Sequence, residues 1–460
     1  MAAGSQLEGE SVLRRKRCGS QATFKKENIV KRFITLVLPC LAIYSSSFAA
    51  TPPAKPNVLI ILADDLGYGD IGVQGQKEVA TPNIDSIAKN GVRFTNGYVS
   101  GTMCSPTRAG LMTGRYQTRF GHEFNPVKPE DGLATTEVTF ADRMKTAGYV
   151  TGLVGKWHLG EVEIDRFHPL QRGFTESSYF AGQKKLPPLT VLRGREQGKI
   201  DEFIGQAVAQ EANAFITRHR NEPWFLYMTP SLVHIPIEVP ENVLARVPAD
   251  AGDDKHRGYL ASIVALDDMV GSVLEKLREL NLEERTLVVF LSDNGGTVAA
   301  NNKPLRGGKG QTAEGSIREP FLVQWKGVIP AGRVLDQPVI SLDLLPTALA
   351  AAGSEVKPEW KLDGVNLLPL LKGETSAPPH PEGLFWKFGD QWAARIGDWK
   401  LVQTGSKRLL PVALYNLKDD IGEKQSLVKE NPDKVKELRA AWERWNSRNV
   451  APLWPQKEGE

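Results

Sequence analysis

Cysteine is scarce in this 460-residue chain, which has only Cys18, Cys40 and Cys104. Residues 25–50 run from a Lys/Arg-rich start through an apolar stretch to small residues ending at Ala49. That three-part pattern predicts a secretory signal peptide within a leader of residues 1–50. Cleavage after Ala49 would leave Cys104 alone in a compartment where thiols tend to be oxidised. An internal disulfide is then excluded, and the lone cysteine calls for a chemical explanation.

A long hydrophobic run is also missing. The apolar segment at residues 33–44 is too short to cross a bilayer, which needs about 20 apolar residues. Lipid anchoring at Cys40 is a minor alternative, because Pro39 stands where a lipoprotein signal usually has a small residue. We therefore predict a periplasmic or secreted protein without a stable membrane anchor.

An excess of basic charge is absent. The whole chain has a net charge of +3, but residues 1–50 hold eight Lys/Arg and three Asp/Glu, so the rest is near −2. This balance argues against a nucleic-acid partner. The remaining residues, about 410 by this division, exceed one ordinary core, and we expect a catalytic domain at 51–375 and a smaller subdomain at 376–460. The oligomeric state is left open by the sequence.

Several segments share one design, a short apolar run that ends abruptly in polar residues. Such runs are typical of buried parallel strands. They lie at residues 58–63, 150–154, 224–228 and 287–291, and helical patterns lie between them at residues 139–147, 202–220 and 259–280. Alternating strands and helices predict an α/β sandwich in which ligands bind beyond the carboxyl ends of the strands.

The pattern changes after about residue 371. The proline-rich residues 378–381 are typical of a linker. Short antiparallel strands are predicted at residues 383–388, 391–396, 399–403 and 413–417, followed by a closing helix at residues 433–446.

Two of the strand ends are rich in oxygen ligands. Asp64 and Asp65 follow the first apolar run, and Asp293 and Asn294 follow the fourth. Three carboxylates and one amide are the set that a hard divalent cation prefers, so calcium or magnesium fits better than zinc. Taken alone, either pair is explained equally well as a metal-ligand pair or as a strand-end turn or helix cap.

A second group of residues is cationic. It consists of Arg108, Lys156, His158, His234 and Lys309, the last in a glycine-rich loop. Cations that gather beside a metal at strand ends would suit a tetrahedral oxyanion ester, either a phosphate or a sulfate. From the residues alone, the prediction stops at a metal-assisted ester hydrolase with an unexplained cysteine.

Five motifs together resemble the type I, formylglycine-dependent sulfatases of the alkaline phosphatase superfamily. The signature CSPTR lies at residues 104–108 and continues as AGLMTGR to residue 115. The others are GKWHLG at 155–160, LADDLGYGD at 62–70, SDNGG at 292–296, and GKG at 308–310 with EG at 314–315. The resemblance extends from about residue 56 to the C-terminus.

This resemblance implies an alkaline-phosphatase-like fold, with a large, mostly parallel sheet flanked by helices. It also implies that a formylglycine-generating enzyme oxidises Cys104 to an aldehyde, whose hydrate attacks sulfur and then expels sulfate. Arg108 would steady that hydrate. Calcium would be held by Asp64, Asp65, Asp293 and Asn294 and would touch residue 104. Lys156 and His158 would orient the nucleophile and bind sulfate, with His234 and Lys309 on the leaving-group side.

The substrate is suggested by a shorter resemblance. Residues 119–126 are similar to a segment of polysaccharide sulfatases from marine bacteria, some of which act on carrageenans. We therefore expect a sulfated galactan-type polysaccharide or its oligosaccharides, with His122 touching a sugar or, alternatively, buried as a hydrogen-bonded core residue. Trp386, Trp392 and Trp399 could stack on sugar rings, but we expect at least two of them in the core.

Two other functions compete with this prediction. A phosphomonoesterase or phosphodiesterase of the same superfold would also need metal and cations, but would usually carry a Ser or Thr nucleophile and more metal. A non-catalytic protein that binds sulfated glycans would tolerate the loss of Cys104 or Lys156, and the chain keeps both.

Overall fold

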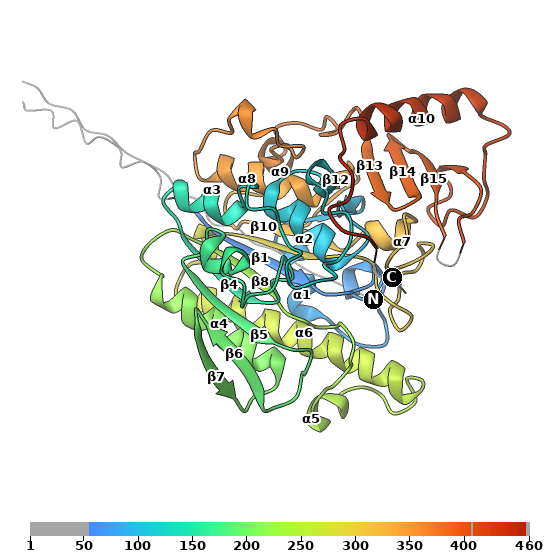
Figure 1. Cartoon of the computed structure of the whole chain (residues 1–460). Coiled ribbons are helices and arrows are strands. Elements are labelled where there is room, and N and C mark those ends of the chain that lie inside the picture. The colour runs from blue at the N-terminus through green and yellow to red at the C-terminus, as the bar shows by residue number, and fades with distance from the viewer. Residues whose placement is uncertain (1–54, 406–407, 457–460) are drawn as a thin grey trace, which may run out of the picture. The chain divides into compact units, whose positions relative to one another are not determined.

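A ten-stranded sheet lies at the centre of the fold (Figure 1). The structure is a computed structural model that describes residues 55–405 and 408–456. The predicted leader, residues 1–50, lies outside the described residues. In spatial order the strands are β11 (Arg333–Leu335), β2 (Val92–Phe94), β10 (Phe321–Gln324), β9 (Thr286–Ser292), β1 (Asn57–Ala63), β8 (Trp224–Thr229), β4 (Val150–Gly155), β5 (Glu176–Ala181), β6 (Leu189–Arg193) and β7 (Glu196–Ile200).

The sheet is mostly parallel, which confirms the predicted fold class. Strands β9, β1, β8, β4 and β5 are neighbours and run in the same direction. In this sheet only β10 and β6 run the opposite way. All four strands predicted from apolar runs lie in the parallel centre.

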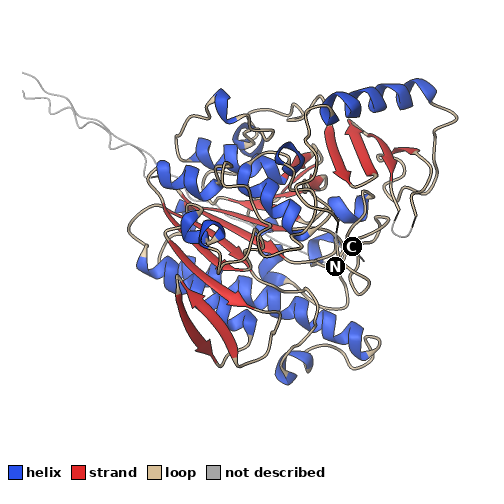
Figure 2. Cartoon of the chain, in the orientation of Figure 1, coloured by secondary structure: helices blue, strands red, loops and turns tan. Residues whose placement is uncertain are grey.

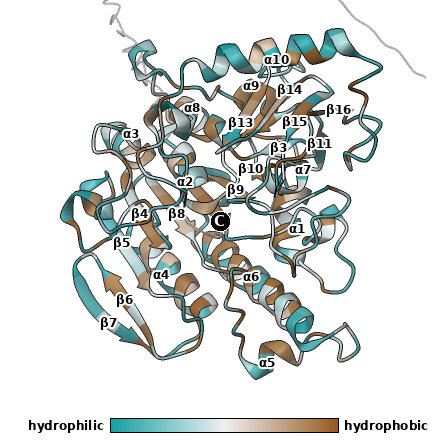
Figure 3. Cartoon of the chain, turned by 45° about the vertical axis from the view of Figure 1, so that its right-hand side comes forward, coloured by the Kyte–Doolittle hydropathy of each residue, from teal (hydrophilic) through white to brown (hydrophobic). Residues whose placement is uncertain are grey.

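Both faces of the sheet are covered by helices (Figure 2). Leu59 and Ile61 of β1 pack with α1 (Pro82–Lys89), α4 (Ile204–Arg218) and α6 (Asp254–Glu279). Val58, Ile60 and Leu62 face the opposite way, toward α2 (Cys104–Thr113), α3 (Phe140–Thr146), α8 (Leu344–Ala351) and α9 (Leu368–Lys372). Burial on both faces explains why the β1 sequence is continuously apolar rather than alternating. The central strands are accordingly brown in Figure 3, whereas the edge strand β7 is largely teal.

A second, antiparallel sheet follows near the C-terminus. It is formed by β13 (Leu384–Phe388), β14 (Gln391–Ile396), β15 (Trp399–Gln403) and β16 (Ala413–Asn416), and α10 (Pro432–Asn446) packs on it. Its core contains Trp386, Trp392 and Trp445 together with Tyr98 and Tyr116 from the large-sheet region. Trp386 and Trp392 are buried, so the expectation of at least two core tryptophans is confirmed.

Short elements complete the described fold. They are β3 (Gly97–Tyr98) paired with β12 (Val339–Ile340), the helices α5 (Glu241–Leu244) and α7 (Glu314–Ile317), and 3-10 turns at Gly72–Gln74, Gln117–Phe120, Asp165–Phe167, Pro169–Gln171, Glu283–Arg285, Ser341–Asp343 and Pro358–Trp360. Within residues 55–405 and 408–456, no helix combines the length and apolar character that a membrane span requires.

Helix α6 and the hairpin of β6 and β7 are examples of differences from the sequence prediction. Helix α6 begins at Asp254, five residues before the predicted start, because the Asp253 side chain accepts a hydrogen bond from the His256 amide and caps the first turn. The hairpin of β6 and β7 was not predicted. Its second strand, EQGKI, is mostly polar because it lies at the sheet edge, so it lacks an apolar pattern.

A buried ionic cluster joins helix α7 to the C-terminal sheet. Lys400 of β15 lies 2.8 Å from Glu314 and 3.0 Å from Glu423, and all three side chains are inaccessible to solvent. Glu314 also pairs with Arg318 at 3.3 Å and accepts a hydrogen bond from Tyr98 at 2.7 Å. Burial alone would raise the pKa of Glu314, but Lys400 and Arg318 lower it to about 2. The carboxylate is therefore ionised, and it fixes α7 against the C-terminal sheet.

Replacing Lys400 by Met should strongly destabilise the fold. The substitution keeps the side-chain length but leaves two buried carboxylates without their ammonium, a loss that costs about 3–5 kcal/mol of unfolding free energy. The measurement is chemical denaturation of Lys400→Met beside Lys418→Met, which removes the same charge from an exposed lysine. Equal unfolding midpoints for the two variants would contradict this account of the cluster.

Candidate functional site

The carboxyl ends of four adjacent parallel strands carry the polar residues singled out by the sequence. Strands β9, β1, β8 and β4 are consecutive in the sheet. Asp293 and Asn294 follow β9, Asp64 and Asp65 follow β1, the loop with His234 follows β8, and Lys156 and His158 follow β4. Parallel strands end at the same sheet edge, so residues far apart in sequence are brought together there.

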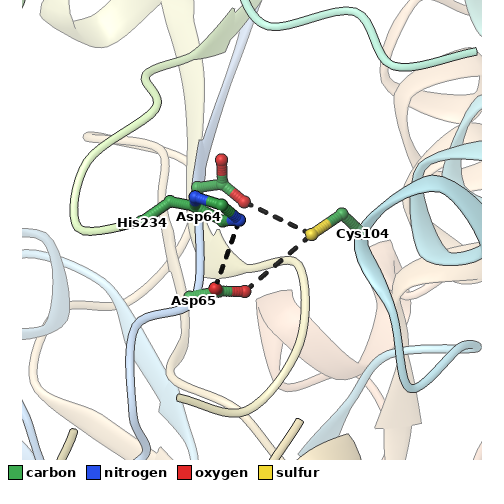
Figure 4. A group of neighbouring side chains, drawn as sticks. All are labelled: Asp64, Asp65, Cys104 and His234. Atoms are coloured by element: carbon green, nitrogen blue, oxygen red, sulfur yellow. Dashed lines mark hydrogen bonds and ion pairs between the residues drawn. The ribbon is translucent and has the colours of Figure 1, made fainter. Parts of the chain in front are cut away.

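The two aspartates after β1 are buried and point to one place. In Figure 4 their carboxylates face the Cys104 sulfur, which approaches from α2. Asp65 has a φ of +63°, a left-handed conformation that is uncommon outside glycine. Its amide donates to Asp293 Oδ1 at 3.2 Å, which links the ends of β1 and β9. The turn after β1 therefore presents two consecutive carboxylates to the same site.

Cys104 is the first residue of α2, whose residues are all buried. Its Sγ lies 3.5 Å from Asp64 Oδ1, 3.8 Å from Asp65 Oδ1 and 3.1 Å from Lys309 Nζ. A helix N-terminus carries a partial positive charge, which favours negative charge at this position. Burial and the neighbouring Asp293 raise the pKa of the Cys104 thiol.

Each of these three carboxylates lies within 3 Å of a cationic side chain, and Asp64 is also 3.6 Å from Arg108. Arg108 Nη2 lies 2.7 Å from Asp293, Lys156 Nζ 2.8 Å from Asp64, and Lys309 Nζ 2.7 Å from Asp65. Burial would raise the pKa of Asp64, but Lys156 and Arg108 hold it well below its usual value. In the site, buried carboxylates and cationic side chains therefore lie next to one another.

The two histidines occupy different positions. His234 Nε2 lies 3.6 Å from Asp65, and its ring is partly exposed. His158 has a φ of +59°, and its backbone carbonyl accepts the Ser105 hydroxyl at 2.6 Å. Burial and Lys156 lower the pKa of His158 well below its ordinary value, so the ring is neutral near pH 7.

A cation fits this group of side chains. Ligand atoms of Asp64, Asp65, Cys104 and His234 lie within 4.8 Å of one another. Asn294 Nδ2 donates to Asp65 at 2.7 Å, while its Oδ1 is buried without a hydrogen-bond partner in the described part of the chain. A buried, unused amide oxygen beside carboxylates is what a hard cation would satisfy. The unused oxygen makes Asn294 a further candidate ligand beside that group.

His122 does not lie where a sugar could reach it. Its side chain has no exposed surface, and Nε2 lies 2.7 Å from Ser105 Oγ. The ring also packs edge-on against Trp454, with centroids 4.8 Å apart. The proposed sugar contact is therefore corrected in favour of the buried alternative. Because the Ser105 proton goes to the His158 carbonyl, His122 must donate to Ser105, and burial lowers its pKa to about 3 and keeps it neutral.

Two cavities adjoin the site, and His234 lines both. One has a volume of about 700 Å³ and includes Asp65, Lys303 and Lys309 in its wall. The other, about 380 Å³, is lined by Asp64, Lys156, His158 and a further lysine, Lys185. Sequence reasoning missed Lys185 because it belongs to no motif, and its neighbour Lys184 looks identical in sequence but is exposed.

Comparisons with known proteins agree with this geometry. The sulfatase family model matches residues 56–354. The N-acetylgalactosamine-6-sulfatase of Homo sapiens is 36% identical over 389 residues, covering 76% of this chain and 72% of that protein. Arylsulfatase A of Bos taurus is 36% identical over 400 residues, covering 78% of this chain and 76% of that protein.

Solved structures give the same result. The crystal structure of Ps i-CgsB in complex with k-i-k-neocarrahexaose has a TM-score of 0.81 and 32% identity, covering 88% of this chain and 95% of that one. The PsFucS1 sulfatase from Pseudoalteromonas sp. has a TM-score of 0.76 and 26% identity, covering 86% and 90%. With a strand-end site of buried carboxylates, cations and Cys104 already in place, these matches show that the chain belongs to the sulfatase family and is a sulfuric ester hydrolase.

Proposed function

We propose that this protein is an exported sulfatase that removes sulfate from a galactan-type carbohydrate, with residue 104 as nucleophile and a calcium ion in the site. The observation that carries the proposal is the position of Cys104, whose sulfur at the start of α2 lies against Asp64, Asp65 and Lys309. Nucleophile, candidate metal ligands and cations meet there at one point.

The nucleophile we propose is formylglycine, made from Cys104 by a separate modifying enzyme. When hydrated, the aldehyde supplies one hydroxyl that attacks sulfur and displaces the sugar alcohol. The second hydroxyl then loses its proton as the carbon–oxygen bond to sulfate breaks, which releases sulfate and restores the aldehyde. A thiol would lack that second hydroxyl, so an unmodified cysteine would stall after one event. Arg108 lies one helical turn after Cys104, where it holds Asp293 and steadies the modified residue.

The surrounding cationic residues have different proposed roles in binding sulfate and in release of the leaving group. Lys156, with its ammonium beside Asp64, binds the sulfate oxygens and, with the neutral His158, orients the nucleophile. Lys309 and His234 border the larger cavity, where the leaving group departs. Fixed charges in a buried site favour the transition state because they need no reorganisation as charge develops.

Calcium is the ion we propose, with magnesium as the alternative. Asp64, Asp65, Asp293 and Asn294 would hold it, and it would supply charge stabilisation to a sulfate oxygen and to residue 104. Calcium accepts irregular sets of oxygen ligands, whereas magnesium demands near-octahedral geometry.

The phosphatase alternative is less well supported by the site. Such an enzyme would use a Ser or Thr nucleophile, and the candidate next to Cys104 is Ser105. The Ser105 hydroxyl already has two hydrogen-bond partners and is not free to act as a nucleophile. It donates to the His158 carbonyl at 2.6 Å and lies 2.7 Å from His122. The alternative of a non-catalytic glycan-binding protein does not account for Cys104 among the charged residues.

The carbohydrate substrate is supported by names of similar proteins. Ps i-CgsB was crystallised with k-i-k-neocarrahexaose, a carrageenan oligosaccharide by its name, and the human relative is named for N-acetylgalactosamine 6-sulfate. A periplasmic or secreted location fits such a polymer, and it rests on the signal-like pattern at residues 25–50.

The first test removes the ion. Chelation should abolish most turnover and lower the thermal midpoint, and added calcium should restore both, because an ion that binds only the folded state stabilises it. Asn294→Ala should need about tenfold more calcium for the same thermal shift, whereas Asn221→Ala, at an exposed site, should not. Full activity and an unchanged midpoint in ion-free enzyme would rule out the metal site.

The second test concerns residue 104. Cys104→Ser should lose at least about 10³-fold in turnover, or accumulate a sulfated enzyme, because serine provides one hydroxyl and not two. Peptide mass analysis of active wild-type protein should find an aldehyde at position 104. An intact cysteine in protein that performs many turnovers would disprove the mechanism.

The third test concerns the substrate. Sulfated galactan oligosaccharides should be turned over with kcat/KM at least about tenfold above that of simple aryl sulfates, because contacts beyond the sulfate stabilise the transition state. Kinetics on defined oligosaccharides, with sulfate release as readout, provide the measurement. Faster turnover of aryl sulfates than of every sulfated glycan would defeat the proposal.

A further inference from the structure

Lys185 is a buried lysine beside the site that no sequence motif marks. It lies in the loop between β5 and β6, and only 2% of its surface is exposed. Its backbone is fixed at both polar groups: the amide donates to Glu238 at 2.8 Å, and the carbonyl accepts from the Ile204 amide at the start of α4. Its position is therefore set by the fold rather than by a mobile loop.

The ammonium of Lys185 has no ionic partner among the described residues. It donates a hydrogen bond to Ser231 Oγ at 3.1 Å, although an ammonium has three donors. By contrast, Lys156 and Lys309 each lie within 3 Å of a carboxylate. Burial lowers the pKa of Lys185 to about 8, so the group is still mostly charged at neutral pH. A buried charge without a partner is costly, which indicates that a partner arrives from outside.

The cavity in front of Lys185 is where that partner would enter. The smaller cavity, about 380 Å³, is lined by Lys185 and Ser231 together with Lys156, His158 and His234. Its volume lies in the range of small-molecule sites, about 300–1,000 Å³. Because the same cavity is lined by Lys156 and His158, a sugar held there by its scissile sulfate would extend its neighbouring substituents toward Lys185.

We propose that Lys185 binds a second oxyanion of the substrate, a sulfate or a carboxylate carried by the same sugar or the adjacent one. This inference rests on the proposed function and adds a specificity-determining residue to it. Asp64, the carboxylate with the largest effect on the pKa of Lys185, is already paired with Lys156, and Glu238 accepts the Lys185 amide, so the positive charge of Lys185 is available to the substrate. The enzyme should thus prefer substrates that carry more than one anionic group.

The experiment compares Lys185→Met with Lys184→Met, which removes the same charge at the exposed neighbouring position. Three probes share one scissile sulfate ester: a galactan oligosaccharide with that sulfate alone, the same oligosaccharide with a second sulfate, and a sulfated oligosaccharide with an adjacent uronate. The readout is the ratio of kcat/KM for each dianionic probe to kcat/KM for the monosulfated probe. In Lys185→Met this ratio should fall about 10- to 100-fold below the wild-type value for one of the two dianionic probes, mainly through a higher KM. The probe that loses most identifies sulfate or carboxylate. Lys184→Met should keep the wild-type ratio.

An unchanged ratio in Lys185→Met would overturn the proposal. So would an equal loss on all three probes, because Lys185 would then act on the scissile sulfate. Thermal unfolding of the variants checks that each is folded. Calorimetric binding of the two oligosaccharides with second anions to Cys104→Ala, with and without Lys185→Met, provides a readout independent of turnover. If binding depends on Lys185 but the wild-type protein hydrolyses no sulfate ester, the anion site is supported and the proposed reaction is refuted.

Discussion

Charge pairing at the ends of four parallel strands is the interaction on which the site depends. Asp64, Asp65 and Asp293 would repel one another in a buried space, and each lies against Lys156, Lys309 or Arg108. These pairs join segments that are distant in sequence, and they hold both strand ends and α2 in place. The same arrangement creates a concentrated, fixed field at Cys104. The same ion pairs therefore fix the backbone at the strand ends and create the electrostatic field around Cys104.

The strand ends were predictable because their signals are local. A buried parallel strand shows a continuous apolar run, and the polar residues after it mark the shared edge of the sheet. The sequence alone therefore places Asp64, Lys156 and Asp293 at that edge. The C-terminal strands were placed within a residue or two for a similar reason, since turn residues separate short β-rich runs.

Burial of single polar residues was not predictable. His122 is enclosed by Trp454, which lies more than 300 residues later in the chain, and no local pattern encodes that contact. Lys184 and Lys185 are adjacent and identical, yet one is exposed and the other is buried. What separates them is the hydrogen bonding of the loop to Glu238 and α4, a tertiary property.

Neighbouring residues at the start of α2 have separate tasks. Cys104 faces the carboxylates, whereas Ser105 points to His122 and to the His158 carbonyl. Through this network the neutral His122 supports the turn that carries His158, although its own side chain is fully buried. A residue in a signature segment can thus serve the site by holding the backbone of another residue.

The ionic cluster around Lys400 also means that the Lys309 loop gains its supporting contacts only late in synthesis. The Lys309 loop and the helix after it are bonded to residues that are synthesised much later. Gln391 donates to the Gly310 carbonyl at 2.9 Å, and Lys400 pairs with Glu314. Chains are made from the N-terminus at roughly 5–20 residues per second. For tens of seconds, then, a growing chain contains Cys104 but not the groups that fix Lys309. The segment 104–108, fully buried once α2 is packed, is open to other proteins only before that packing, so any enzyme that modifies it has a limited period in which to act.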